Sequence, residues 1–198
     1  MKPKSIVVLI SVLVLLFLIY ISTVVKVYAY INDSIIIMIV AIALYFMYEK
    51  LNLNPLTYSL IIFALILHDL GVFGFYNISP LPIQWDHITH FFSNFSLTFI
   101  SFNYLKKYFS KNKFDNTWLI IFIVLISLGV GAIGELIEFT GYLTVGEGAG
   151  VLGHGKGDIV TELGNSEWLN TMLDLIFNLI GTLTSLVTIS IYYKLKNS

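Results

Sequence analysis

The sequence predicts an all-α protein: a polytopic bundle of about six transmembrane helices that forms a single membrane domain over residues 1–198. Hydrophobic residues make up 57% of the chain and charged residues only 12%, a balance far from that of soluble domains. The apolar residues also lie in long runs, and residues 5–25 and 118–134 contain no charge at all. Such runs match the ~20 residues that cross a ~30 Å hydrocarbon core. They do not alternate with a period of two, which favours helices over a membrane β-barrel.

Each expected span is a mostly apolar segment bounded by charged or turn-forming residues. The segments are 5–25, 29–48, 56–76, 85–105, 118–141 and 171–192, and a glycine-rich outer loop, 142–170, precedes the last one. Lys2 and Lys4 precede the first span as in a signal peptide, but its apolar run exceeds the usual ~7–15 residues. No small-residue cleavage pattern follows it, so we expect a retained anchor. The second span is the weakest, because Asn32 and Asp33 interrupt its apolar start.

The lysines give the expected orientation. All eleven cationic residues are lysines, and nine of them fall on one side of the six spans. Only Lys26 and Lys156 fall on the other side. Positive residues accumulate in cytoplasmic loops, so the sequence predicts a multi-pass protein of the cell membrane with both termini in the cytoplasm.

Composition excludes several functions. The net charge is −1 and no basic patch is present, so no nucleic-acid partner is expected. The chain has no cysteine, which excludes disulfides, thiolate metal sites and thiol chemistry. Membrane lipids are the expected partners, and the oligomeric state is left open.

Ionisable residues inside the spans are the most informative feature of the sequence. Each costs about 2.5–3.5 kcal/mol at mid-membrane on insertion scales, so such residues need a reason to be there. With the orientation above, all of them fall in the outer half of the bilayer. They are His68, Asp69, Asp86, His87, His90, Glu135, Glu138 and Asp174, with the amide of Asn178 beside them.

Helical spacing places these groups on shared faces. Asp86 and His90 are four residues apart, and His87 is three from His90, so one helix presents all three to a common centre. Glu135 and Glu138 are three apart in the same way. Asp174 and Asn178 are four apart, and the nearby glycines Gly131, Gly134 and Gly181 are expected to let the helices approach closely. Three helices therefore aim carboxylate, imidazole and amide groups at one outward-facing pocket.

The first functional hypothesis is a metal-dependent membrane enzyme. Imidazole and carboxylate ligands suit a divalent metal such as Zn²⁺, Mn²⁺ or Fe²⁺, which activates water or stabilises phosphoryl oxygens. The substrate expected at this depth is the headgroup of a lipid or polyprenyl phosphate, and the reaction expected is hydrolysis. The expected metal ligands are His90, Glu135, Asp174 and His87, while Glu138 acts as general base and Asp86 orients His90. Additional candidates for the site are His68, Asp69, Asp158 and Asn178.

Other interpretations stay open. Asp86 and His87 suit a helix start in the headgroup layer, and His68 suits simple packing. The same acids would serve an ion- or proton-coupled transporter, although transport sites usually lie near the midplane between repeats. A non-catalytic membrane factor is the third alternative. No H-E-x-x-H motif is present.

Four short blocks of the sequence resemble a known family. Residues 85–91 (WDHITHF), 134–139 (GELIEF), 157–158 (GD) and 171–174 (TMLD) are similar to signature blocks of the YjdF-like prokaryotic inner-membrane proteins. The resemblance covers roughly residues 60–185. It implies a helical membrane architecture and no particular chemistry.

A fainter pattern resembles the VanZ-like membrane proteins, which are associated with cell-envelope and glycopeptide-resistance contexts. It consists of the motifs D-x-x-x-H-F from Asp86, G-x-x-x-E from Gly131 and D-x-x-x-N-x-x-G from Asp174. That family tends to have Gln where Glu138 stands and Lys where His87 stands. Both departures add metal-ligand capacity to this chain.

Overall fold

A computed structural model describes residues 3–26, 29–76, 78–111, 116–145, 160–161, 164–165 and 167–197, and its architecture there is helical. The helices are α1 (Pro3–Val24), α2 (Ala29–Met47), α3 (Pro55–Leu70), α4 (Trp85–Lys111), α5 (Asn116–Val145) and α6 (Glu167–Asn197), with a π-helix η1 (Gly71–Phe75) directly after α3. Two short strands, β1 (Val160–Thr161) and β2 (Gly164–Asn165), pair antiparallel within the expected outer loop. The predicted fold class, a helical membrane bundle, is confirmed.

The helix bounds differ from the expected spans where local geometry or polar residues intervene. The third helix ends at Leu70 and continues as a π-helix, in which Gly74 adopts φ 127°, a conformation that favours glycine. Asn54 caps the start of α3 by accepting a hydrogen bond of 2.9 Å from the backbone N–H of Thr57. Helices α4 and α6 are longer than expected, and α6 already begins at Glu167.

Among the described residues, three helices are long and apolar enough to cross a membrane. They are the stretches Lys4–Val24, Asn116–Gly141 and Trp168–Leu195. Two further apolar helices, Asp33–Met47 and Pro55–Leu70, are shorter. Helix α4 has 27 residues and so is about 40 Å long. It is much less apolar than α5, because many of its residues are polar.

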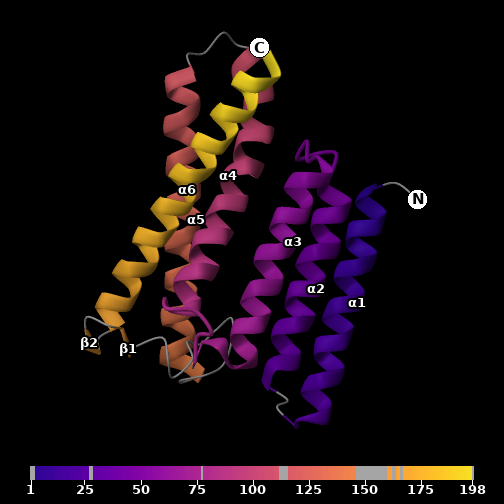
Figure 1. Cartoon of the computed structure of the whole chain (residues 1–198), viewed down its shortest axis with the longest axis vertical. Coiled ribbons are helices and arrows are strands. Elements are labelled where there is room, and N and C mark those ends of the chain that lie inside the picture. Colours follow the sequence, from indigo (N-terminus) through magenta and orange to yellow (C-terminus); the bar gives the residue numbers. More distant parts are fainter. Residues whose placement is uncertain are drawn as a thin grey trace.

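The helices form two groups of three (Figure 1). Helices α1, α2 and α3 lie side by side, and α3 also packs on α4. Helices α4, α5 and α6 form the second group, where the most extensive packing joins α4 to α6. The core of the first group is mostly apolar, with Ala41 and Tyr58 fully buried, although Ser34 and Asp69 are buried there too. The interface between α4 and α6 buries more polar residues, among them Asn94, Asp174 and Asn178.

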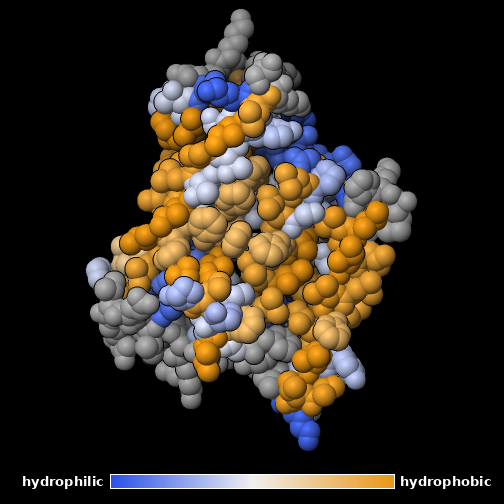
Figure 2. All heavy atoms as spheres, viewed as in Figure 1, coloured by the Kyte–Doolittle hydropathy of each residue, from blue (hydrophilic) through white to orange (hydrophobic). Residues whose placement is uncertain are grey.

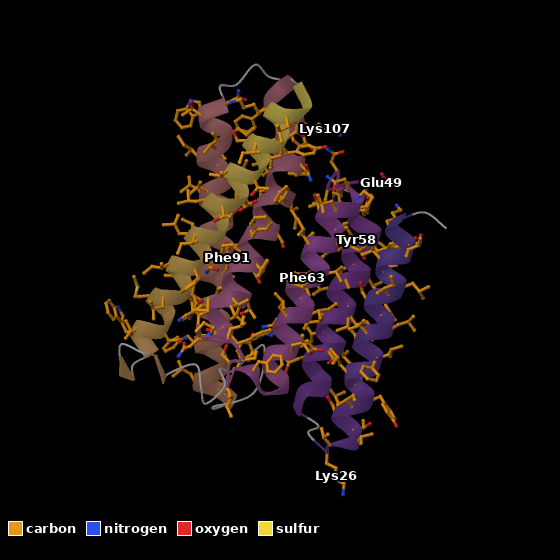
Figure 3. All side chains as sticks on the ribbon, viewed as in Figure 1. Lys26, Glu49, Tyr58, Phe63, Phe91 and Lys107 are labelled. Atoms are coloured by element: carbon orange, nitrogen blue, oxygen red, sulfur yellow. The ribbon has the colours of Figure 1, made fainter. Side chains whose placement is uncertain are left out.

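The outer surface is largely apolar, as expected for a bundle surrounded by lipid. Large hydrophobic side chains are exposed along all three long apolar helices, such as Phe17, Leu125 and Val187. Figure 2 shows hydrophobic residues over much of the visible face, with hydrophilic residues gathered toward the upper end. In Figure 3, Lys107 and Glu49 lie toward that upper end and Lys26 lies at the opposite end.

Candidate metal site

The start of α4 is fixed against α3. The indole Nε1 of Trp85 donates a hydrogen bond of 2.8 Å to the backbone oxygen of Leu67. Asp86 follows in the first turn, where the helix dipole favours a negative charge. Both Asp86 and His87 are only 6% exposed. The first turn of α4 therefore points its ionisable groups into the protein.

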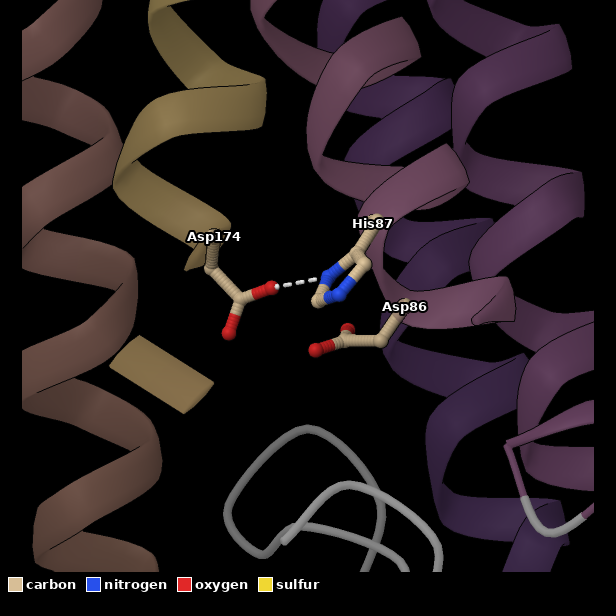
Figure 4. Close-up of side chains that lie close together, drawn as sticks. All are labelled: Asp86, His87 and Asp174. Carbon is tan, nitrogen blue, oxygen red and sulfur yellow. Dashed lines mark hydrogen bonds and ion pairs between the residues drawn. The ribbon is translucent and has the colours of Figure 1, made fainter. Parts of the chain in front are cut away.

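His87 is paired with α6. Its Nδ1 lies 2.9 Å from Oδ1 of Asp174, and its ring stacks on Phe177 with 4.6 Å between the ring centroids. The second oxygen of Asp174 accepts a hydrogen bond of 2.9 Å from Nδ2 of Asn170. Figure 4 shows the side chains of His87 and Asp174 pointing toward one another, with the carboxyl group of Asp86 beside them. Ligand atoms of Asp86, His87 and Asp174 all lie within 4.8 Å of one another.

His90 is held by a different residue of α6. Its Nδ1 lies 3.2 Å from Oδ1 of Asn178, which also accepts a hydrogen bond from Nδ2 of Asn94. An amide oxygen only accepts hydrogen bonds, so Nδ1 of His90 carries the proton. In the neutral ring Nε2 then has a free lone pair, as a metal ligand requires.

The free nitrogen of His90 faces two carboxylates. Nε2 lies 3.4 Å from Oε1 of Glu135 and 3.5 Å from Oδ1 of Asp86. These distances exceed those of a good N–H···O hydrogen bond. They match the ~3.4 Å that separates two ligands bound at ~2.1 Å to a tetrahedral Zn²⁺ ion. Glu138 completes the group, since ligand atoms of His90, Glu135 and Glu138 lie within 4.8 Å of one another.

Two of these carboxylates also have an unsatisfied oxygen. Oδ2 of Asp86 and Oε1 of Glu135 are buried and make no hydrogen bond with the part of the chain that the structure describes. Asp86 and Glu135 are 6% and 7% exposed. An uncompensated buried carboxylate is costly, and a cation among the three groups removes that cost. The arrangement therefore has the ligand types, the spacing and the unsatisfied atoms of a divalent metal site.

Two glycines let the helices come close enough to build the site. A Cβ at Gly131 would lie 2.6 Å from Nδ2 of Asn178, and one at Gly181 would overlap the backbone oxygen of Phe91. The expectation of close approach is met at these two positions. At Gly134 a Cβ would meet nothing within 4 Å, so the expectation is wrong there. Gly134 faces a cavity instead of a helix.

That cavity has a volume of about 490 Å³ and lies between α2, α3, α4 and α5. His90 and Glu138 line it, whereas Glu135 and Asp174 do not. His68 of α3 lines it too. Nδ1 of His68 lies 2.6 Å from the hydroxyl of Tyr76, and its buried Nε2 makes no hydrogen bond with the described residues. The candidate metal group is thus open to a ligand from the cavity side.

Tyr76 and Asn170 take part in the site although the sequence analysis did not name them. Tyr76 reaches His68 because the π-helix folds its ring onto Gly71, where any Cβ would lie 2.5 Å from the ring. Nothing in the sequence marks a π-helix. Asn170 precedes Asp174 by four residues, the same interval that separates Asp174 from Asn178. Extending this pattern by one turn toward the N-terminus would have identified Asn170 from the sequence.

The remaining predicted site residues lie elsewhere or outside the described residues. Asp69 is fully buried and accepts hydrogen bonds of 3.0 and 2.9 Å from the hydroxyl of Ser34 in α2. It belongs to neither ligand group. Asp158 lies outside the described residues. Asp174 and His87, expected to share a metal with His90 and Glu135, form a neighbouring group with Asp86.

An all-helical chain with long apolar helices and a polar interior defines a helical membrane protein. The family model described as "Predicted membrane protein (DUF2238)" matches residues 5–195, and the chain belongs to this family. The YjdF-like proteins, which the sequence resembles, are in the same family. No curated protein and no solved structure matches the chain.

Proposed function

We propose that this protein is a metal-dependent membrane enzyme that hydrolyses the phosphate headgroup of a lipid or polyprenyl phosphate. The observation that carries the proposal is the position of Nε2 of His90, which faces Glu135 and Asp86 at 3.4 and 3.5 Å. A lone pair directed at two carboxylates is unfavourable, so either a proton on Nε2 or a cation must lie between these groups. A Zn²⁺, Mn²⁺ or Fe²⁺ ion bound there has three protein ligands and an open position, as in catalytic metal sites.

The neighbouring residues have distinct roles in this proposal. Asn178 holds the ring of His90 through Nδ1 and so fixes which nitrogen binds the metal. Both oxygens of Asp174 are engaged by hydrogen bonds, so Asp174 supports His87 and leaves the metal to Asp86, His90 and Glu135.

Glu138 is the general base. It belongs to the ligand group of His90 and lines the cavity from which a substrate enters. A cation held by His90, Glu135 and Asp86 would supply Lewis acidity to the phosphoryl group and its nucleophile, and Glu138 would take the proton of the water that attacks the phosphorus of the headgroup. The P–O bond to the departing group breaks, and Glu138 returns the proton to the leaving oxygen. His68, with its free Nε2 on the cavity, is placed to contact a phosphate oxygen.

The membrane setting is part of the proposal. The lysine distribution supports six crossings in the cell membrane with both termini cytoplasmic and the site in the outer leaflet. The VanZ-like pattern at Asp86, Gly131 and Asp174 supports a lipid of the cell envelope as substrate. A transporter is less well supported, because the cavity walls away from His90 are mostly apolar and the polar residues that line it there are Ser93, Asn94 and Ser96 alone among the described residues.

Phosphate release tests this proposal directly. Purified protein in mixed micelles with Mn²⁺ or Zn²⁺ is given a phosphatidic acid or a polyprenyl diphosphate, and inorganic phosphate is measured. We expect Glu138→Gln to slow the wild-type reaction by about 10²–10⁴-fold, as loss of a general base does. Asp69→Asn, a buried carboxyl outside both ligand groups, is the matched control and keeps the wild-type rate. Equal rates for wild type and Glu138→Gln would refute the proposed chemistry.

A further inference from the structure

The cavity beside His90 changes character along its length. Where it meets the site it is lined by His68, His90 and Glu138. Further along α3 and α4, in the direction away from the site, its walls are mostly apolar and include Leu65, Ile61, Leu97 and Ile100. Three small polar residues of α4, Ser93, Asn94 and Ser96, also line it. Because Oγ of Ser96 donates to the backbone oxygen of Leu60, these two helices run past one another in contact at that depth. The cavity is therefore a groove with one polar end and one apolar end.

The length of the groove corresponds to one leaflet. From His90 to Ile100, both of which line it, helix α4 advances ten residues, or about 15 Å at 1.5 Å per residue. That is half of the ~30 Å hydrocarbon core. The groove is thus about as long as a lipid tail that fills one leaflet.

The groove is wide enough for a hydrocarbon chain. A volume of about 490 Å³ spread over about 15 Å gives a mean cross-section of at least roughly 33 Å². A single hydrocarbon chain is slender enough to fit.

The groove is open on the side that faces lipid. Val40 of α2 and Val130 of α5 line it and are 38% and 47% exposed. Helix α2 packs on α1 and α3, whereas α5 packs on α4 and α6, and no extended packing joins α2 to α5 among the described residues. A chain can therefore enter sideways from the bilayer while its headgroup stays at the level of the site.

We propose that this groove binds one hydrocarbon chain of a lipid phosphate and so delivers the headgroup to His90 and Glu138. The identity of the headgroup rests on the proposed function, whereas the evidence for chain binding is the shape and lining of the groove. The occupant is a membrane lipid, because the groove is mostly apolar, about as long as a lipid tail and open to the bilayer. The substrate class is accordingly a lipid phosphate with a long chain, and a water-soluble phosphate ester is excluded.

The test uses a phosphatidic acid that carries a photoactivatable diazirine in the middle of one acyl chain. The full-length protein in proteoliposomes is illuminated, and labelled peptides are mapped by mass spectrometry. We expect label on residues 61–65 of α3 and 97–100 of α4, the apolar half of the groove. Label confined to the outward surfaces of α1 and α6 overturns the proposal.

Two pairs of variants make the test specific. Gly134→Leu projects a side chain into the groove, where a Cβ meets nothing within 4 Å, and Gly129→Leu projects one into equally open space on the same helix but outside the groove. We expect Gly134→Leu to reduce groove labelling about ten-fold, since it displaces at least two methylenes of the chain. We expect the groove of Gly129→Leu to be labelled to the same extent as that of the wild type. Equal labelling of the two variants overturns the proposal.

A second pair decides the question if Gly134→Leu fails to fold. Val40→Trp narrows the groove from the opposite wall, and Ile39→Trp places the same side chain on the outer face of α2. We expect reduced labelling only for Val40→Trp. Bound metal is measured on the same samples. If neither groove variant reduces the labelling and the protein retains its metal, the groove proposal alone is refuted. If the groove is labelled but no metal is bound, the proposed enzyme is refuted and the groove proposal is supported.

Discussion

Replacing Gly181 by alanine tests the helix packing that positions the site, because Gly181 lies where α6 contacts the backbone of α4. The new Cβ would overlap the carbonyl oxygen of Phe91 and lie 3.1 Å from its carbon. Backbone cannot rotate away as a side chain can, so the two helices must separate. Overpacking of this kind costs about 1–3 kcal/mol. For a chain of this size that corresponds to a fall in melting temperature of roughly 2–12 °C.

The separation also predicts an effect on the site. His87 and Asp174 bridge the same two helices at 2.9 Å, two turns from Gly181 on α6. Even a shift of about 0.5 Å lengthens this contact beyond the range of a good hydrogen bond. Thermal unfolding in detergent measures the stability change, and Gly134→Ala is the control, because its Cβ meets nothing within 4 Å. Equal melting temperatures for Gly181→Ala and Gly134→Ala would refute the packing described for α4 and α6.

Three further predictions concern the positioning of His90, the buried carboxyl group of Asp69 and the membrane topology. Asn178→Ala removes the acceptor that holds His90, so metal affinity measured by titration should fall about 10–100-fold, and an unchanged affinity would contradict that role. Asp69→Ala leaves the hydroxyl of Ser34 without its acceptor and should cost about 1–3 kcal/mol in unfolding while metal binding stays at the wild-type level. Cysteines placed at Lys26 and Lys107 of this cysteine-free chain report the orientation: an impermeant thiol reagent should label position 26 and not 107 in intact cells, and the reverse pattern would invert the topology.

The helical class and much of the clustering could be predicted from the sequence. Charge-free runs as long as residues 5–25 have few solutions other than a membrane helix. Spacings of three and four residues place Asp86, His90 and Glu135 on definite helix faces, and the structure brings these three side chains together. Periodicity is sufficient here because the groups lie on regular helices.

The finer arrangement depends on contacts that periodicity does not encode. Spacing alone does not tell whether Asp174 faces His87 or His90, since the two histidines are less than one turn apart on α4. The axial offset of α4 and α6 decides the pairing, and the contact of Gly181 with Phe91 sets that offset. As a result, Nδ1 of His90 faces Asn178, while Asp86, which was expected to orient His90, lies 3.5 Å from Nε2.

The ends of the helices also depend on local contacts. The expected last span begins at residue 171, whereas helix α6 already begins at Glu167, and Nδ2 of Asn170 donates to Asp174 in its first turns. The expected third span runs through Gly71 and Gly74 to residue 76, whereas the structure forms a π-helix over these glycines. Apolar periodicity marks neither feature.

Metal content tests the central claim most directly. Protein purified in mild detergent, incubated with Zn²⁺ or Mn²⁺ and separated from free ion is analysed for metal per chain, and its melting temperature is recorded with and without chelator. We expect about one tightly held ion per wild-type chain, loss of that ion in Glu135→Gln and His90→Ala, and its retention in the buried-carboxyl control Asp69→Asn. Chelator should lower the melting temperature of the wild type, because an ion bound only to the folded state stabilises it by about 2.7 kcal/mol at a concentration one hundred times its Kd. Wild-type protein that binds no ion and melts at the same temperature with and without chelator would contradict the account.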